Sequence, residues 1–135
     1  MKLTPELYFL VLAVFATALM WVPYLVARIG VRGLLPAMGN PDPSQAPDPA
    51  WADRARRAHL NAIENLALFA PLVLVAAFAG ISTPATVLAA KTYLVARLVH
   101  YVVYAAGIPV VRTLAFAAGF VATLVFAMAL LGHAT

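Results

Sequence analysis

Polar residues of several chemical types interrupt two otherwise apolar stretches of the sequence in regular rows. The rows are Arg57, Asn61 and Glu64, followed by Arg97, His100 and Tyr104. Spacings of three, four and seven residues place each row on one face of an α-helix. Guanidinium groups beside a carboxylate can bind a ligand that carries both anionic groups and an ammonium. The two rows are therefore the first candidates for a functional site.

The rows match in length, since each covers seven residues or about 10 Å of helix. On neighbouring antiparallel helices joined by a short loop, ascending numbers on one row meet descending numbers on the other. The predicted pairs are Glu64 with Arg97, Asn61 with His100, and Arg57 with Tyr104. The spacing leaves open whether the partners belong to one chain or to two subunits.

A buried glutamate–arginine pair also occurs as a purely structural contact between membrane helices. Such a contact needs one cation for each carboxylate, whereas arginines are in excess at one end of the predicted ladder. They are Arg54, Arg56, Arg57 and Arg112. This excess favours a binding site for a ligand with several anionic groups over a structural contact alone.

Composition determines the class of protein that must position these rows. Of 135 residues, 64% are hydrophobic and only 10% are charged, so the chain has more apolar surface than a small soluble domain could bury. Four stretches are long enough to cross a bilayer, at about 7–27, 58–80, 85–106 and 113–131. We therefore expect a single all-α membrane domain over residues 1–135, an integral four-helix bundle in contact with lipid. The nine basic residues are better explained by membrane topology than by nucleic-acid binding.

The connections between spans differ in composition. Residues 30–47 are rich in proline and glycine and predict an extended loop, after which Asp48 and Pro49 resemble a helix cap and first turn. The arginines gather in or beside the first and third connections. Both connections are therefore expected on the cytoplasmic side, with both termini on the opposite side.

Two further patterns concern ligands and packing. The sequence has no cysteine, and His59, His100 and His133 are too scattered to predict a metal site. Small residues recur every four positions in the last span, at Ala115, Gly119, Thr123 and Ala127. Such a face allows close approach of another helix and is compatible with oligomerisation.

Two segments of the sequence resemble the MAPEG family, the membrane-associated proteins in eicosanoid and glutathione metabolism. They are RARRAHLNAIENLALFAP at 54–71 and ARLVHYVVY at 96–104. The similarity is greatest to the microsomal glutathione transferase branch, in a form typical of bacterial members. It implies a four-helix subunit of a homotrimer in the bacterial inner membrane, with glutathione as thiol co-substrate between neighbouring subunits and a hydrophobic small molecule as second substrate.

The resemblance also implies roles for individual residues. The glutathione-binding set would be Arg54, Arg57, His59, Asn61, Glu64, Arg97, His100 and Tyr104. Within it, Glu64 would face the amino group of glutathione. Arg112 and Tyr104 would be the catalytic residues, with Arg112 stabilising the thiolate and with Arg28 and Arg32 as alternatives for that role. Asn65 replaces a tyrosine of the leukotriene-forming branch, which disfavours leukotriene C4 synthesis.

Three functions remain open from the sequence. The favoured one is a membrane transferase or peroxidase that uses glutathione or another small thiol against lipid-soluble electrophiles or hydroperoxides. The second is a non-catalytic membrane module that binds lipid or serves as an accessory subunit of a larger complex. The third is a proton-coupled carrier that uses Glu64.

Overall fold

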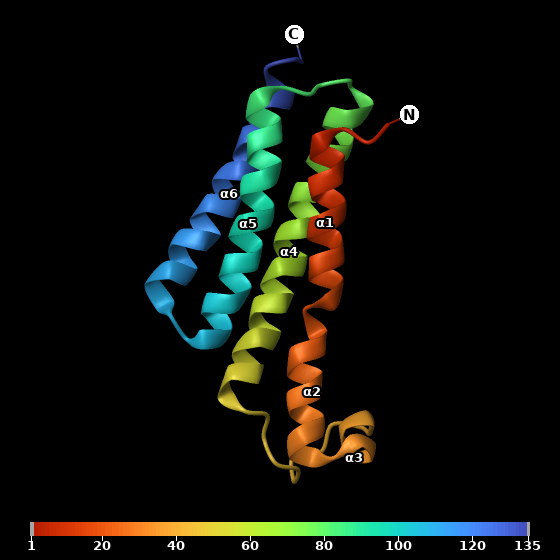
Figure 1. Ribbon diagram of the computed structural model, residues 1–135, viewed down its shortest axis with the longest axis vertical. Coiled ribbons are helices and arrows are strands. Elements are labelled where there is room, and N and C mark those ends of the chain that lie inside the picture. Colours follow the sequence, from red (N-terminus) through yellow and green to blue (C-terminus); the bar gives the residue numbers. More distant parts are fainter. Residues whose placement is uncertain (1, 135) are drawn as a thin grey trace.

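The computed structural model describes residues 2–134, and this part of the chain folds into helices joined by short connections (Figure 1). The helices are α1 (Pro5–Leu19), α2 (Trp21–Arg32), α3 (Leu34–Met38), α4 (Ala50–Phe78), α5 (Pro84–Ala106) and α6 (Pro109–Leu131). Helices α1 and α2 follow one another along one edge of the bundle, and α4, α5 and α6 run beside them. Both described chain ends lie at the same end of the molecule (Figure 1).

Four helical segments are long and apolar enough to cross a membrane. They are Pro5–Arg32, Ala50–Phe78, Pro84–Ala106 and Pro109–Leu131. The four predicted spans are thus confirmed, although each helix begins before its predicted start and the second ends at Phe78 rather than near residue 80. The last one begins at Pro109 rather than near residue 113, because proline at the first helical position needs no hydrogen-bond partner for its nitrogen.

The first span contains a break at Met20, between α1 and α2. Pro23 explains the break, because proline has no N–H to donate to the carbonyl four residues earlier and its ring crowds that carbonyl. The Tyr101 hydroxyl of α5 donates a hydrogen bond of 2.8 Å to the Met20 carbonyl. A side chain from another helix therefore supports the backbone where the first span is interrupted.

The connection between the first two spans is more ordered than its composition predicts. Helix α2 continues through Arg32, and Leu34–Met38 forms the short helix α3, so the prediction of an extended loop from residue 30 was wrong for this part. Pro36 is compatible with α3 because it lies in the first turn, where N–H groups have no intrahelical acceptor. Within this connection, irregular structure is confined to Gly33 and residues 39–49.

The bundle core lies between α1, α4, α5 and α6. The Phe69 ring stacks on the Tyr93 ring at a centroid distance of 3.7 Å, and Phe126 meets Phe69 edge-on at 5.3 Å. At the start of α5, Thr83 and Thr86 form a reciprocal capping box, and Pro84 occupies the first turn. Ser82, Thr83 and Pro84 also predict a cap and a first-turn proline from the sequence alone, and the structure confirms both.

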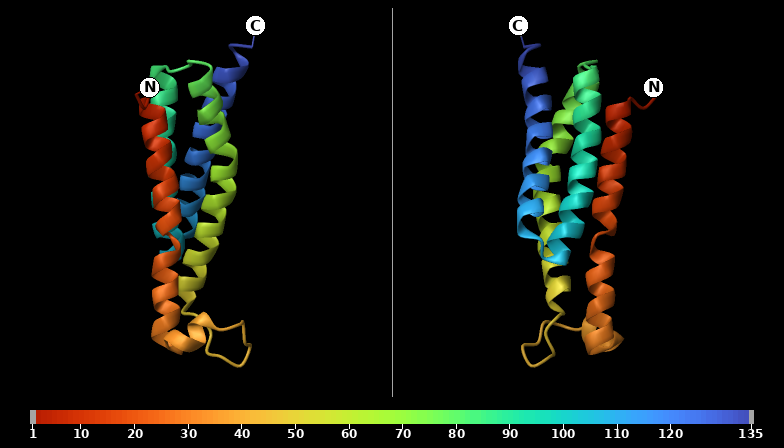
Figure 2. Two further views of the ribbon diagram at one scale, coloured as in Figure 1. Left: turned by 90° about the vertical axis from the view of Figure 1, so that its right-hand side faces the viewer. Right: turned by 60° about the vertical axis from the view of Figure 1, so that its left-hand side comes forward.

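The two long spans on one side of the bundle project beyond the other two. In both views of Figure 2, α2 and the beginning of α4 extend past the turn between α5 and α6. Helix α4 has 29 residues, or about 44 Å at the usual rise, against a hydrocarbon thickness of about 30 Å. Helix α4 is therefore longer than the hydrocarbon core requires, and its first turns lie at the projecting end of the bundle with the 39–49 connection.

Candidate functional site

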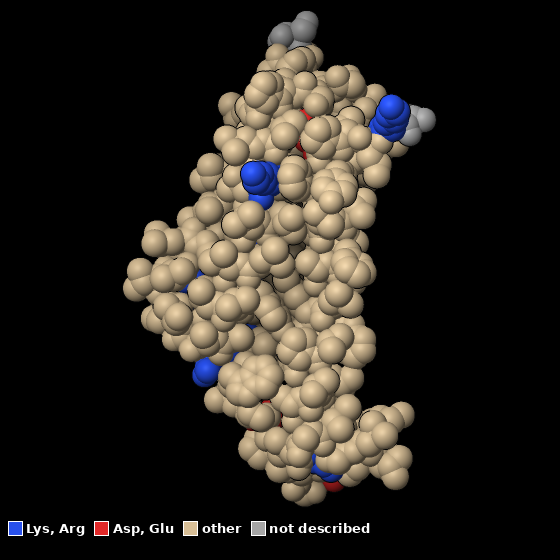
Figure 3. Space-filling model, viewed as in Figure 1, with Lys and Arg blue, Asp and Glu red and all other residues tan. Residues whose placement is uncertain are grey.

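The polar row on α4 faces outward from the chain. Arg57 and Glu64 are exposed, and Asn61 between them is half-buried. Arg57 pairs with Asp53 of its own helix at 2.9 Å, whereas Glu64 forms no ion pair with any cation in residues 2–134. Exposed apolar residues flank the row on α4, among them Leu60, Ile63 and Leu68. The face of the molecule drawn in Figure 3 likewise shows few charged atoms along the middle of the bundle. A carboxylate on such a surface is costly in a bilayer unless something covers it.

The row on α5 points into the bundle instead. Arg97 is buried, with 3% of its surface exposed. Its Nη1 donates to the Asn61 side-chain oxygen at 3.2 Å, and its Nη2 donates to the Phe116 carbonyl at 3.3 Å. The predicted Glu64–Arg97 pair was therefore wrong for a single chain, since Arg97 meets α4 one helical turn away, at Asn61.

Gly119 on α6 explains where the Arg97 guanidinium lies. A Cβ atom at Gly119 would stand only 2.5 Å from Nη2 of Arg97, closer than real contacts allow. Gly119 and Ala115 are both buried within the chain. At these two positions the small-residue face of the last span therefore accommodates α5, rather than remaining free for another subunit.

The described chain brings the two predicted catalytic residues together near the turn between α5 and α6. The Arg112 guanidinium carbon lies 4.4 Å from the centroid of the Tyr104 ring, and His100 meets Tyr104 edge-on at 5.5 Å. These side chains line an open recess of about 290 Å³, which we call the α5–α6 recess. Its lining residues are His100, Tyr104, Arg112, Thr113 and Phe116. Sequence reasoning missed Thr113 and Phe116, although their spacing from Arg112 puts them on adjoining parts of the α6 surface.

The α4 row and the recess lie next to one another. Arg97 bonds to Asn61 of the row and to the backbone of Phe116, which lines the recess. The pair predicted between Asn61 and His100 is thus replaced by a connection through Arg97. A ligand that covers the row on α4 could also reach into the recess.

Arg54 supports the backbone beside the recess. Its Nε donates to the Ala105 carbonyl at 3.0 Å, and its guanidinium packs against Gly107. Gly107 has φ of +79°, a left-handed conformation that terminates α5 and favours glycine. The structure thus gives Arg54 a contact at the end of α5, outside the lining of the recess.

His59 lies on a different side of α4 from the polar row. Its Nδ1 is 2.9 Å from the Tyr24 hydroxyl of α2. The structure therefore does not bring His59 together with Asn61, Glu64 and Tyr104 within one chain. In residues 2–134, no three His, Asp or Glu side chains are grouped so that they could hold a metal ion.

A second charged cluster lies at the projecting end of the bundle. Asp48 accepts hydrogen bonds from Arg28, the shortest at 2.7 Å, and pairs with Arg32 at 3.2 Å. It does not cap α4, as the sequence predicted, because its carboxylate is engaged by these arginines and α4 starts without a side-chain cap. The Arg28 hydrogen bonds, with the charges of both arginines, hold the pKa of the Asp48 carboxyl below its ordinary value.

These features define an integral membrane protein of four helical spans with a polar site between the last three. The comparison with protein families then places the chain in the MAPEG family, whose model matches residues 8–132. The match covers nearly the whole chain and confirms the resemblance found in the two sequence segments. No curated protein matches the chain.

Membership of the family supports a membrane protein of the glutathione and eicosanoid metabolism kind. It leaves the reaction, the thiol and the assembly unassigned. We base the proposals for the reaction, the thiol and the assembly on the geometry of the α4 row and the α5–α6 recess.

Proposed function

We propose that the chain is a subunit of a homotrimeric membrane enzyme that uses glutathione, or another small thiol, as a transferase or peroxidase. The observation that carries this proposal is the position of Arg112 over the Tyr104 ring in an open recess next to the outward-facing row of Arg57, Asn61 and Glu64. The row offers partners for carboxylate and ammonium groups, and the recess offers a guanidinium for a thiolate.

In this proposal Arg57 binds a carboxylate of glutathione and Glu64 binds its ammonium, while Asn61 supplies an amide between them. The thiol lies in the α5–α6 recess. A free thiol has a pKa near 8.5, so little thiolate is present at neutral pH, and the positive charge of Arg112 favours the ionised form. Arg54 and Arg97 are positioning residues, since they hold the end of α5 and the contact between α4 and α6.

Two reactions follow from a stabilised thiolate. In transfer, the sulfur attacks an electrophilic carbon and a leaving group departs with its electron pair. In peroxide reduction, two thiols reduce a hydroperoxide to an alcohol and water, and a disulfide forms between them. A second substrate that dissolves in lipid would reach the sulfur from the bilayer.

The dimensions of the recess support an assembled site. Its volume of about 290 Å³ lies at the lower end of the range for ligand pockets, and Arg57 and Glu64 are exposed beside it. A neighbouring copy would cover this surface and remove Glu64 from lipid. We propose the homotrimer on this basis, with the first and third connections on the cytoplasmic side of a bacterial inner membrane and residues 1–135 as one domain.

The experiment is a thiol titration of the detergent-purified protein, followed by turnover of chlorodinitrobenzene and cumene hydroperoxide. We expect thiolate absorbance on addition of glutathione and its loss in Arg57→Gln and Glu64→Gln. Arg56→Gln is the matched control, because Arg56 is an exposed arginine on the same helix that lies outside the row. Unchanged thiol binding in both row variants would exclude the proposal.

The alternative functions predict different results. A non-catalytic lipid module would show neither thiolate absorbance nor turnover with wild-type protein. A proton-coupled carrier would show uptake in proteoliposomes that Glu64→Gln abolishes, without dependence on Arg112. Co-expression of Glu64→Gln with Arg112→Gln adds a test of geometry, since mixed trimers stay inactive if each site takes both residues from one copy.

A further inference from the structure

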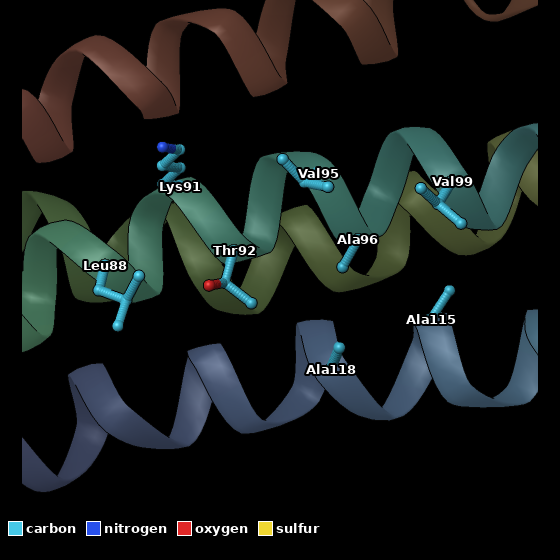
Figure 4. Close-up of a pocket in the computed structure, with 8 residues that line it drawn as sticks. All are labelled: Leu88, Lys91, Thr92, Val95, Ala96, Val99, Ala115 and Ala118. Carbon is cyan, nitrogen blue, oxygen red and sulfur yellow. The ribbon is translucent and has the colours of Figure 1, made fainter.

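A groove between α5 and α6 opens on a face of the bundle that the proposed thiol site does not use. It consists of two adjoining hollows of about 390 and 420 Å³ that share Leu88, Thr92 and Ala118. In Figure 4 the groove runs along α5 and α6, between the two helices, and opens toward the viewer. Helix α4 passes behind α5. We call it the lipid-facing groove.

Apolar side chains line most of this groove, as expected of a site for a hydrocarbon chain. Besides Lys91 and Thr92, its lining residues are alanine, leucine and valine. The part between Lys91 and Val99 covers about 12 Å of helix, which is close to one leaflet of a hydrocarbon core of about 30 Å. The groove therefore matches a single acyl chain lying along the helices.

Lys91 is the charged residue of this groove and lies exposed on α5. It forms no ion pair with any carboxylate in residues 2–134. Its Cα lies about 10 Å along the helix from Pro84, and side chains of a helix lean toward its N-terminus, so the ammonium reaches toward the headgroups at that end. A cation there, without a protein partner, is complementary to an anionic headgroup.

Thr92 provides a second observation that points to a ligand. The other threonines inside membrane-spanning helices bond within the chain, to a backbone carbonyl or to Glu6; they are Thr17, Thr86, Thr113 and Thr123. The Thr92 hydroxyl makes no such bond to any described residue, and the Thr92 side chain points toward α6 into the groove, whereas Lys91 stands at the opposite rim of α5 (Figure 4). It can donate to an ester or phosphate oxygen of a lipid whose chain fills the groove.

We infer that the lipid-facing groove binds one anionic phospholipid from the leaflet at the N-terminal end of α5. Lys91 contacts the phosphate, Thr92 an adjacent oxygen, and one acyl chain lies against Ala96, Val99 and Ala115. Helices α5 and α6 also carry the recess with Tyr104 and Arg112, so the bound lipid fills the outer side of the same helix pair. The inference does not depend on the thiol chemistry.

The experiment quantifies the lipid retained by the full-length protein. The protein is reconstituted in vesicles of phosphatidylcholine and phosphatidylglycerol in equal amounts, extracted in mild detergent, and measured by native mass spectrometry. We expect phosphatidylglycerol to be retained in preference to phosphatidylcholine. Lys91→Gln should lower its retention about fivefold, as expected for one cation near a membrane surface. Lys2→Gln, which removes a cation at the same end of the bundle, should leave retention unchanged.

A second pair of variants tests the groove itself. Ala118→Phe fills the floor shared by both hollows and should reduce retention, whereas Ala117→Phe adds the same ring at an exposed position on α6 outside the groove lining and should not. Lys91 is exposed, so its replacement leaves the packing intact and remains informative if a bulky variant fails to fold. Equal retention of the two lipids, or of phosphatidylglycerol by wild type and Lys91→Gln, would overturn the inference.

Discussion

The Arg112 guanidinium lies over the Tyr104 ring, 4.4 Å from the ring centroid, and the two residues come from opposite sides of the turn between α5 and α6. A cation held against an aromatic face keeps its charge and loses rotational freedom. Its position beside an open recess leaves the N–H groups that do not face the ring available to a ligand. The pair is therefore the most specific chemical feature of the proposed site.

Replacement of this cation should impair the proposed chemistry. We expect Arg112→Gln to lower kcat/KM with glutathione by about 10–100-fold, since each tenfold loss corresponds to about 1.4 kcal/mol of transition-state stabilisation. The thiolate absorbance of the complex should fall in parallel. Tyr104→Phe keeps the ring under the guanidinium, so it should retain more thiolate than Arg112→Gln. The reverse order would assign the stabilising contact to the tyrosine hydroxyl.

The contact between Gly119 and Arg97 predicts a stability effect. Gly119→Ala should destabilise the protein by about 1–3 kcal/mol, because the added methyl group overlaps a buried guanidinium that three helices surround. Gly30→Ala is a suitable control, as nothing lies within 4 Å of its Cβ position. Thermal unfolding in detergent measures both. A smaller loss at Gly119 than at Gly30 would contradict the packing described for Arg97.

Asp48 predicts a dependence on pH. Its pKa is lowered in the folded protein, so its contribution to stability is present above the ordinary carboxyl pKa of about 4 and is lost as the pH falls through the lowered value. Asp48→Asn should therefore cost about 1 kcal/mol at neutral pH, and this cost should shrink as the pH falls below the ordinary carboxyl pKa of about 4. Unfolding midpoints across this range measure the difference. Asp53→Asn, which removes an exposed partner of Arg57, should have a smaller effect at neutral pH.

A buried contact at the opposite end of the bundle gives a fourth prediction. Glu6 is 2% exposed and accepts a hydrogen bond of 2.7 Å from Thr86 and one of 2.9 Å from Ser82. Thr86→Val removes one of these donors and should cost about 1–3 kcal/mol, because the buried carboxylate keeps only the Ser82 hydroxyl and the Thr83 N–H of the capping box loses its acceptor. The same change at the exposed Thr113 should cost far less. Thermal unfolding of the two variants provides the comparison.

The sequence predicted the spans well because their signal is simple. Four apolar stretches and the caps around Pro84 depend on local composition, and the structure contains all of these elements. The break at Met20 and the helix at Leu34–Met38 were harder to predict. The presence of a proline does not say whether it interrupts a helix, as Pro23 does, or is tolerated in a first turn, as Pro36 is.

The members of the candidate site remain a prediction from the sequence, and the structure differs from the predicted pairing of these residues within one chain. Periodicity placed Asn61 and Arg97 on facing helices, yet it could not predict the one-turn offset that Gly119 permits. His59 entered the predicted set only through the family resemblance, whereas its spacing of two residues from Arg57 and from Asn61 turns its side chain to another face of α4. Rotation and offset between helices depend on how side chains interlock, which a single sequence does not encode in any short pattern.

The interruption at Met20 brings the backbone of the first span into direct contact with α5. Pro23 removes one backbone link, and the Tyr101 hydroxyl from α5 bonds at the break. Helix α2, which carries Arg28 and Arg32, therefore begins directly after a residue that is bonded to α5 and continuous with α1. Tyr101, three residues before Tyr104 on α5, is therefore a direct contact between the helix that carries the recess and the break from which the arginine-bearing α2 begins.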